Sequence, residues 1–159
     1  MLSTNRKRID SRDWFRWGLV IVWMSGIFLL SHQRASESSE LSRIITKLLY
    51  SVAYRIFPQI DFDFTTLSFI VRKAAHFIAY LILGCLVMNG FIDKKIPATK
   101  WLGWALVVCV LYAVSDEIHQ LYVPGRAGQV RDVFIDSVGA LMGIGLYFGM
   151  SRRRREHTR

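Results

Sequence analysis

The chain has 159 residues, enough for one domain, and 52% of them are hydrophobic. The apolar residues are gathered in long runs, which excludes an ordinary soluble domain, because a chain this short cannot cover several fully apolar helices. The formal net charge of +9 would suit a nucleic-acid-binding protein, but the basic residues flank the apolar runs, as they do in membrane proteins. We therefore expect membrane lipids, and no nucleic acid, as partners.

Four runs have the length of membrane-spanning helices, because a hydrocarbon core of about 30 Å needs about 20 mostly apolar helical residues. We predict spans at about 14–31, 74–92, 101–122 and 133–150. The first run follows a basic stretch, as in a signal peptide. However, it contains Trp14, Trp17 and Trp23, and no small-residue cleavage site follows it. We therefore expect a retained helix.

The long connection between the first two spans contains apolar residues at helical spacing. They are Leu41, Ile44, Ile45, Leu48, Leu49, Val52, Ala53 and Ile56. Ser38 or Ser39 can cap the start of this segment, and Pro58 ends it. We predict an amphipathic helix at about 39–57, lying on the outer membrane surface.

Basic residues mark one side of the membrane under the positive-inside rule. They are Arg6, Lys7, Arg8, Arg12 and Arg16 before the first span, Lys94, Lys95 and Lys100 between the second and third, and Arg152–Arg155 and Arg159 after the fourth. With four crossings, these groups share one side. We predict a basic cytoplasmic N-terminus at 1–13, a membrane domain at 14–150 and a basic cytoplasmic tail at 151–159.

Polar residues gather on one face of three predicted helices, given the helical rotation per residue. They are Arg72, Lys73, His76 and Tyr80 on the second, Asp116, Glu117, His119 and Gln120 on the third, and Asp132 and Asp136 on the fourth. Gln33 ends the first helix, and Arg126 lies in the last connection. In the predicted topology all of them meet near the outer surface. Ionisable groups at such depth are costly and mark functional sites.

The chain resembles the VanZ-like membrane proteins at four motifs. Residues 73–80 match K-x-x-H-F-x-x-Y, residues 116–126 match D-E-x-x-Q-x-x-x-P-G-R, and residues 132–143 match D-x-x-x-[ND]-x-x-G-x-x-x-G. Residues 31–33 resemble S-S-Q, with His32 in the middle position. The resemblance covers about residues 14–150. It implies a multi-pass protein of the bacterial plasma membrane, linked to resistance to teicoplanin, a glycopeptide that binds cell-wall precursor.

Our first hypothesis is a site for a phosphate-bearing lipid or lipid-linked cell-wall precursor, such as a polyprenyl phosphate, in the outer leaflet. Arg72, Lys73, Arg126 and Arg131 would hold phosphate. The expected ligand-binding residues are Gln33, Arg72, Lys73, His76, Tyr80, Asp116, Glu117, Gln120, Arg126, Asp132 and Asp136.

The second hypothesis is a membrane hydrolase or transferase with acid–base or metal chemistry, and whether the protein is an enzyme stays open. Its catalytic candidates are His76, Asp116 and Glu117. A metal held by His76, Glu117, His119 and Asp132 has no ligand spacing like that of known motifs, so we expect no metal and no other cofactor. A third alternative is an ion-pair network that only fixes the bundle.

The buried carboxylate of Asp136 needs a partner. Arg126, Arg72 and Lys73 are the cations expected to reach it, ahead of His76. Gly139 with Gly143, and Gly145 with Gly149, have the G-x-x-x-G spacing that permits close helix contact. We therefore predict an all-α membrane bundle of four transmembrane helices with one additional outer amphipathic helix.

Overall fold

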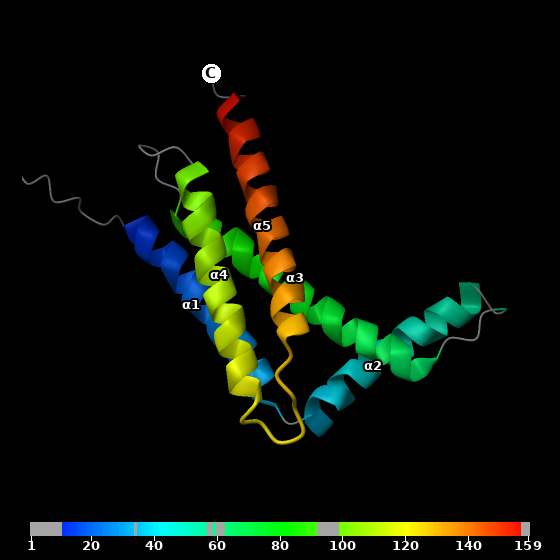
Figure 1. Ribbon diagram of the computed structural model, residues 1–159. Helices are drawn as coiled ribbons and strands as arrows, with labels where there is room; N and C mark the ends of the chain where they lie inside the picture. The colour runs from blue at the N-terminus through cyan, green and yellow to red at the C-terminus, as the bar shows by residue number, and fades with distance from the viewer. Residues whose placement is uncertain (1–10, 34, 57–58, 60–62, 92–98, 157–159) are drawn as a thin grey trace, which may run out of the picture.

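The computed structural model describes residues 11–33, 35–56, 59, 63–91 and 99–156. They form five helices and, within those residues, no strand (Figure 1). The helices are α1 (Ser11–Ser31), α2 (Ala35–Ile56), α3 (Phe64–Phe91), α4 (Thr99–Gln120) and α5 (Val130–Glu156). All except α2 are long and apolar enough to cross a membrane. The predicted all-α membrane fold is confirmed.

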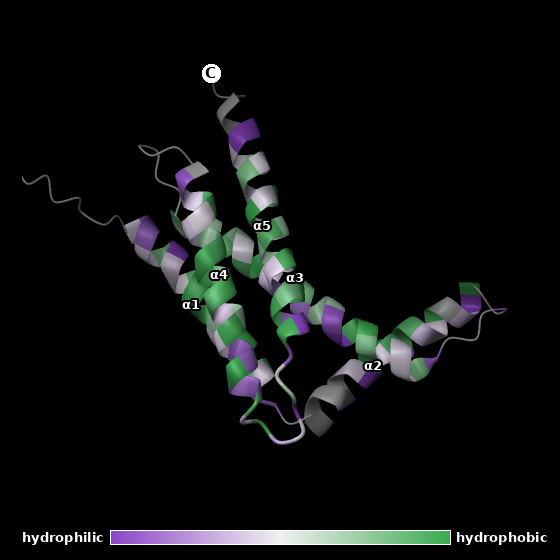
Figure 2. Cartoon of the chain, viewed as in Figure 1, coloured by the Kyte–Doolittle hydropathy of each residue, from purple (hydrophilic) through white to green (hydrophobic). Residues whose placement is uncertain are grey.

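Helix α3 is central, because it contacts each of the other four helices. The interior is formed by its buried side chains Tyr80, Leu83, Val87 and Met88, together with small residues of α4 and α5. Apolar residues dominate the middle of the bundle, and polar residues gather towards the helix ends (Figure 2). This is the distribution that a hydrocarbon layer between two aqueous phases requires.

Helices α3 and α5 approach closely through glycines. A Cβ atom at Gly139 would lie 2.5 Å from the backbone oxygen of Phe77, and one at Gly143 would overlap the backbone oxygen of Leu81. The thiol of Cys85 donates to the Gly143 carbonyl at 3.2 Å. By contrast, Gly145 and Gly149 face open space. Of the two G-x-x-x-G pairs, only Gly139 with Gly143 therefore mediates close helix contact.

Helix α3 starts well before the apolar run at 74–92. Asp63 caps its first turn, accepting hydrogen bonds from the backbone N–H groups of Thr65 at 3.2 Å and Thr66 at 2.9 Å. The extra turns carry α3 out to the side of the bundle, where they lie against α2 (Figure 1).

Helix α2 forms close to the predicted range and is amphipathic. It buries Ser42 and Thr46, whose hydroxyl donates to the Ser42 carbonyl at 2.7 Å. Ile44, Leu48 and Val52 of its apolar stripe are exposed. An apolar stripe that no other helix covers is expected where a helix lies against lipid.

The end of the bundle where α1 begins and α3 ends is aromatic. Trp17 contacts Phe91 edge-to-face, with ring centroids 5.0 Å apart, and Phe91 stacks on Trp101 at 5.3 Å. Such rings are typical of a membrane–water interface. The basic residues Arg6, Lys7, Arg8, Lys94, Lys95 and Arg159 expected at this end, and Pro58 after the amphipathic helix, lie outside the described residues.

Candidate functional site

Asp116 links α1 and α4 at the opposite, polar end of the bundle. The hydroxyl of Ser31 donates to Asp116 Oδ2 at 2.9 Å, and Gln120 Nε2 donates to the same oxygen at 3.3 Å. Ser31 is the last residue of α1, and Gln120 is the last of α4. The exposed fraction of Asp116 is only 1%. A carboxylate in the apolar third span is thus held by a neighbouring helix.

Two side-chain pairs connect α3 to α5. Lys73 forms an ion pair with Asp132, and His76 Nδ1 lies 3.7 Å from Asp136 Oδ2. The expectation that Arg126, Arg72 or Lys73 would be the partner of Asp136 is therefore wrong. Lys73 is held one helical turn away at Asp132. His76, which follows it by three residues on the same face of α3, occupies the position beside Asp136.

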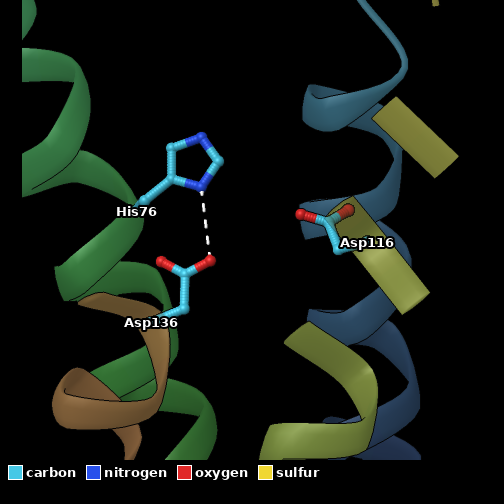
Figure 3. A group of neighbouring side chains, drawn as sticks. All are labelled: His76, Asp116 and Asp136. Carbon is cyan, nitrogen blue, oxygen red and sulfur yellow. Dashed lines mark ion pairs between the residues drawn. The ribbon is translucent and has the colours of Figure 1, made fainter. Parts of the chain in front are cut away.

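His76, Asp116 and Asp136 come from three different helices and converge (Figure 3). One possible ligand atom from each lies within 4.8 Å of the others. Both oxygens of Asp136 and one oxygen of Asp116 are buried without a hydrogen-bond partner among the described residues. Buried polar atoms are nearly always satisfied in native proteins, so these atoms indicate a bound ligand or ordered water.

Arg126 is positioned by the turn after α4. Gly125 has a φ of 80°, a left-handed conformation that side chains other than glycine rarely adopt. Arg126 Nε then donates to the Gln33 carbonyl at 3.0 Å, and its Nη2 donates to the Leu30 carbonyl at 3.3 Å. Because backbone carbonyls are neutral partners, the guanidinium keeps its full positive charge.

Arg72 and Arg126 face a common cavity of about 130 Å³. Burial, and next the positive charge of Arg72, lower the pKa of Arg126; an arginine nevertheless stays protonated at neutral pH. Arg72 Nε is itself buried without a hydrogen-bond partner in the described part of the chain. Two guanidinium groups that line one cavity can together hold an anion.

The cavity has a polar wall and an apolar wall. The polar wall consists of Ser31, Gln33, Ser42, Arg72, His76, Tyr80 and Arg126. The apolar wall consists of Ile27, Leu30, Ile45, Val71, Ala75 and Ala79. Leu30 and Ile45 are largely exposed, so the apolar rim reaches the surface that lipid would cover. Of the predicted ligand-binding residues, Gln33, Arg72, His76, Tyr80 and Arg126 meet here.

Glu117 has a different position from Asp116. Its Oε2 accepts a hydrogen bond from the backbone N–H of Gln129 at 2.8 Å, which ties the connection after α4 to the helix. Its other oxygen is buried and has no hydrogen-bond partner among the residues that the structure describes. A Cβ atom at Gly128 would lie 2.5 Å from the backbone oxygen of Glu117, so the connection packs tightly. Glu117 positions this loop and does not line the cavity.

His119 lies apart from the other predicted residues. Its Nε2 is 3.1 Å from Nδ1 of His32, and its ring lies 4.3 Å from that of Phe28. Arg131 is exposed and does not line the cavity. The four residues weighed as a metal set are thus not brought together. A different trio is formed, because Asp116 and Asp136 face His76.

Sequence reasoning missed Ser31 as a contact of the site. Its neighbour Gln33 was selected, but the side-chain hydroxyl that reaches Asp116 belongs to Ser31. The Ser31-His32-Gln33 motif could have indicated this contact, because Ser31 is the last residue of the helix and its hydroxyl faces the bundle interior. The backbone oxygens of Leu30 and Gln33 that bind Arg126 left no signal in the sequence, because every residue carries one.

A sequence model of the VanZ/LLP1 family matches residues 15–151. No curated protein and no solved structure shows significant similarity to the chain. Because the match covers most of the chain, the protein belongs to the VanZ/LLP1 family. The resemblance found at the four motifs is confirmed.

Proposed function

We propose that this VanZ/LLP1 protein binds a phosphate-bearing lipid or lipid-linked cell-wall precursor in the outer leaflet of the bacterial plasma membrane. The phosphate would lie between Arg72 and Arg126. The observation that carries the proposal is this pair of guanidinium groups at one cavity, neither of them in an ion pair with a carboxylate of the described residues.

Guanidinium groups bind phosphate through two parallel hydrogen bonds, which gives both affinity and orientation. Arg126 already donates from Nε and Nη2 to backbone oxygens and is thereby held in place. The buried Nε of Arg72 has no hydrogen-bond partner in the described ranges and is available to a ligand. A site with one fixed and one available guanidinium suits a single phosphate group.

The apolar wall of the cavity explains why the ligand would be a lipid. Leu30 of α1 and Ile45 of α2 flank the cavity and remain exposed at its edge. In a membrane, acyl or polyprenyl chains cover such side chains, because apolar surface is removed from water there. A lipid can therefore place its phosphate at the arginines while its chain stays in the hydrocarbon region.

Native mass spectrometry of the detergent-purified protein tests the binding. The probes are undecaprenyl phosphate, phosphatidylglycerol and zwitterionic phosphatidylcholine. Arg72→Gln removes a charge-assisted contact worth about 1.5–3 kcal/mol, so the affinity for phosphate-bearing anionic lipid should fall about tenfold or more. Arg43→Gln is the matched control, because Arg43 is exposed on α2 and pairs with Glu40.

If Arg72→Gln and Arg43→Gln lowered the affinity for anionic lipid equally, only the overall positive charge of the protein would attract the lipid. Tighter binding of undecaprenyl phosphate than of phosphatidylglycerol would favour a cell-wall carrier over a bulk phospholipid. Equal binding of phosphatidylcholine would refute an anion site.

The same preparation separates a binder from an enzyme. His76 lines the cavity and is the acid–base candidate nearest to the arginines along α3. Lipid that stays chemically unchanged after incubation with the protein indicates binding alone. Conversion that His76→Ala abolishes indicates a hydrolase or transferase.

The resemblance to teicoplanin-resistance proteins extends the proposal to a phenotype. Binding of a lipid-linked cell-wall precursor would alter how much of the glycopeptide target is accessible. Expression in a teicoplanin-susceptible bacterium should raise the minimal inhibitory concentration, and Arg72→Gln at equal membrane abundance should reverse the rise. An unchanged concentration would limit the proposal to lipid binding.

A further inference from the structure

We propose that His76, Asp116 and Asp136 form a zinc-binding site between α3, α4 and α5. Zinc accepts imidazole nitrogen and carboxylate oxygen at about 2.0–2.2 Å. Two ligands in a tetrahedral arrangement are then about 3.4 Å apart. The three candidate ligand atoms already lie within 4.8 Å of one another, and His76 Nδ1 and Asp136 Oδ2 are 3.7 Å apart. Small side-chain rotations therefore suffice to close the site.

The charges of the trio match a divalent cation. Two aspartates contribute two negative charges in a place where the exposed fraction of each is at most 1%. A buried carboxylate in a membrane helix needs a positive partner. Lys73 pairs with Asp132 and Arg126 binds backbone oxygens, and no lysine or arginine of the described residues forms an ion pair with Asp116 or Asp136. One divalent ion would neutralise both carboxylates at once.

The unpartnered atoms point to a ligand independently of the clustering. Within the described part of the chain, both Asp136 oxygens and Asp116 Oδ1 are buried without hydrogen bonds, whereas Asp116 Oδ2 is held by Ser31 and Gln120. Metal-bound carboxylates usually have such outer partners, which orient them for the ion. Figure 3 shows the carboxylates of Asp116 and Asp136 directed towards the space beside the His76 ring.

The chemistry of the set favours zinc over magnesium or calcium. Hard cations prefer ligand sets made of oxygen alone, whereas imidazole suits zinc and other transition metals. Three protein ligands leave a fourth position of a tetrahedral ion for an outside ligand. His76 and Tyr80 also line the cavity, so a ligand in that cavity is next to the trio; the buried Tyr80 hydroxyl has no hydrogen-bond partner among the described residues.

The test is zinc binding to the purified full chain in detergent after removal of metals with a chelator. We expect about one Zn²⁺ per chain by elemental analysis after dialysis. Outer partners of a metal are typically worth about 10–100-fold in affinity. Loss of a direct ligand in His76→Gln or Asp136→Asn should therefore cost more than about 100-fold. Isothermal titration calorimetry with Zn²⁺ and Mn²⁺ measures the affinities.

His119→Gln is the matched control, because it removes a histidine of the neighbouring His32–His119 pair, outside the trio. It should retain the zinc. Loss of zinc in His119→Gln alone would place the ion on that pair and overturn the proposal, as would tighter binding of Mn²⁺ or no binding by the unaltered protein.

A variant that fails to fold is identified by size-exclusion chromatography. For such a case, the unaltered protein still decides the question through Co²⁺, whose visible absorption reports its ligands. Cobalt absorption typical of nitrogen and oxygen ligands, retained in His119→Gln, supports the trio. Absence of a cobalt spectrum refutes it. Neither measurement requires a lipid, so failure of the zinc site leaves the phosphate proposal to its own test.

Discussion

Asp116 is the side chain at which four helices meet at the polar end. It lies on α4, accepts a hydrogen bond from Ser31 of α1, and faces His76 of α3 and Asp136 of α5. A charged carboxylate at membrane depth costs about 2.5–3.5 kcal/mol on insertion scales. Only one of the two Asp116 oxygens has hydrogen-bond partners among the described residues. Because the charge is costly and incompletely hydrogen-bonded, we expect Asp116 to bind a ligand.

Asp116→Asn separates function from folding. Asparagine has the same shape and can still accept the Ser31 hydrogen bond, but it carries no charge. We expect thermal stability and membrane abundance to hold or rise, because a desolvated charge is removed. Zinc binding should fall more than about 100-fold, because a direct, charged ligand of the ion is lost. Abundance that falls in proportion to binding would instead favour the ion-pair network that only fixes the bundle.

The residues of the site were largely predictable, but their pairing was not. Helical periodicity places Asp132 and Asp136 on one face of α5, and Lys73 and His76 on one face of α3. It does not fix the register of one helix against the other. A shift of one turn, about 5.4 Å, would bring Lys73 to Asp136. The contact of Gly139 with Phe77 sets the observed register and brings His76 there.

At the level of helices, the contact between α3 and α5 determines whether the trio forms. Asp136, Gly139 and Gly143 lie on the same face of α5, and the two glycines touch the backbone of α3. Any side chain added at these glycines would push apart the helices that carry His76 and Asp136. The geometry of the His76–Asp116–Asp136 trio therefore depends on the close contact of these two glycines with α3.

Gly143→Leu should impair both assembly and function. A side chain there meets backbone atoms of Leu81 and Cys85, which cannot move aside without displacing the helix. Overpacking of this kind costs about 1–3 kcal/mol or more. Gly149→Leu is the matched control, because a Cβ atom there meets open space, and its effect should stay within about 0.5 kcal/mol. Thermal unfolding and lipid binding are measured together. Equal behaviour of the two variants would show that this contact does not organise the site.

The cap of α3 gives a pH-dependent prediction. Hydrogen bonds from the Thr66 hydroxyl, and from the Thr66 and Thr65 backbone N–H groups, lower the pKa of Asp63 below its usual 3.8. A lowered pKa means that the charged carboxylate contributes stability above 3.8, and that this contribution is lost as the pH falls through the folded-state pKa.

Asp63→Asn isolates this contribution, because asparagine also caps helices but does not titrate. The unaltered protein should unfold at a slightly higher temperature than Asp63→Asn at neutral pH, and the difference should vanish in acid below the pKa of Asp63. A difference in unfolding temperature that is constant across the acid range would show that the charge of Asp63 is not what stabilises the first turn of α3.

For the whole molecule, the sequence predicted the number of spans, the additional amphipathic helix and the gathering of polar groups at one end. Hydropathy predicts these features well, because the hydrocarbon core of a membrane requires every backbone N–H and C=O group to be hydrogen-bonded within the protein, as it is in a helix. The side position of α2 with the first turns of α3 was not predictable, since α2 buries the polar residues Ser42 and Thr46 and leaves apolar residues such as Ile44 and Leu48 exposed. That arrangement forms one wall of the cavity.

The proposed function requires the polar end to face outward, with both termini in the cytoplasm. Basic residues near the aromatic end support this orientation through the positive-inside rule. At the polar end, the charge of Lys73 is paired with that of Asp132. The orientation is tested by labelling single cysteines with a membrane-impermeant thiol reagent on intact cells. Cys85 and Cys109 are first replaced by alanine.

A cysteine at Ala127 should react, because this exposed residue lies in the connection between α4 and α5. Gly128 is unsuitable, since an added side chain would collide with the Glu117 backbone. A cysteine at Thr158, beyond α5, should react only after the cells are permeabilised. The reverse pattern would place the arginine pair in the cytoplasmic leaflet. A lipid-linked precursor displayed outside the cell would then not reach it, although the cavity would still suit an anionic lipid of the inner leaflet.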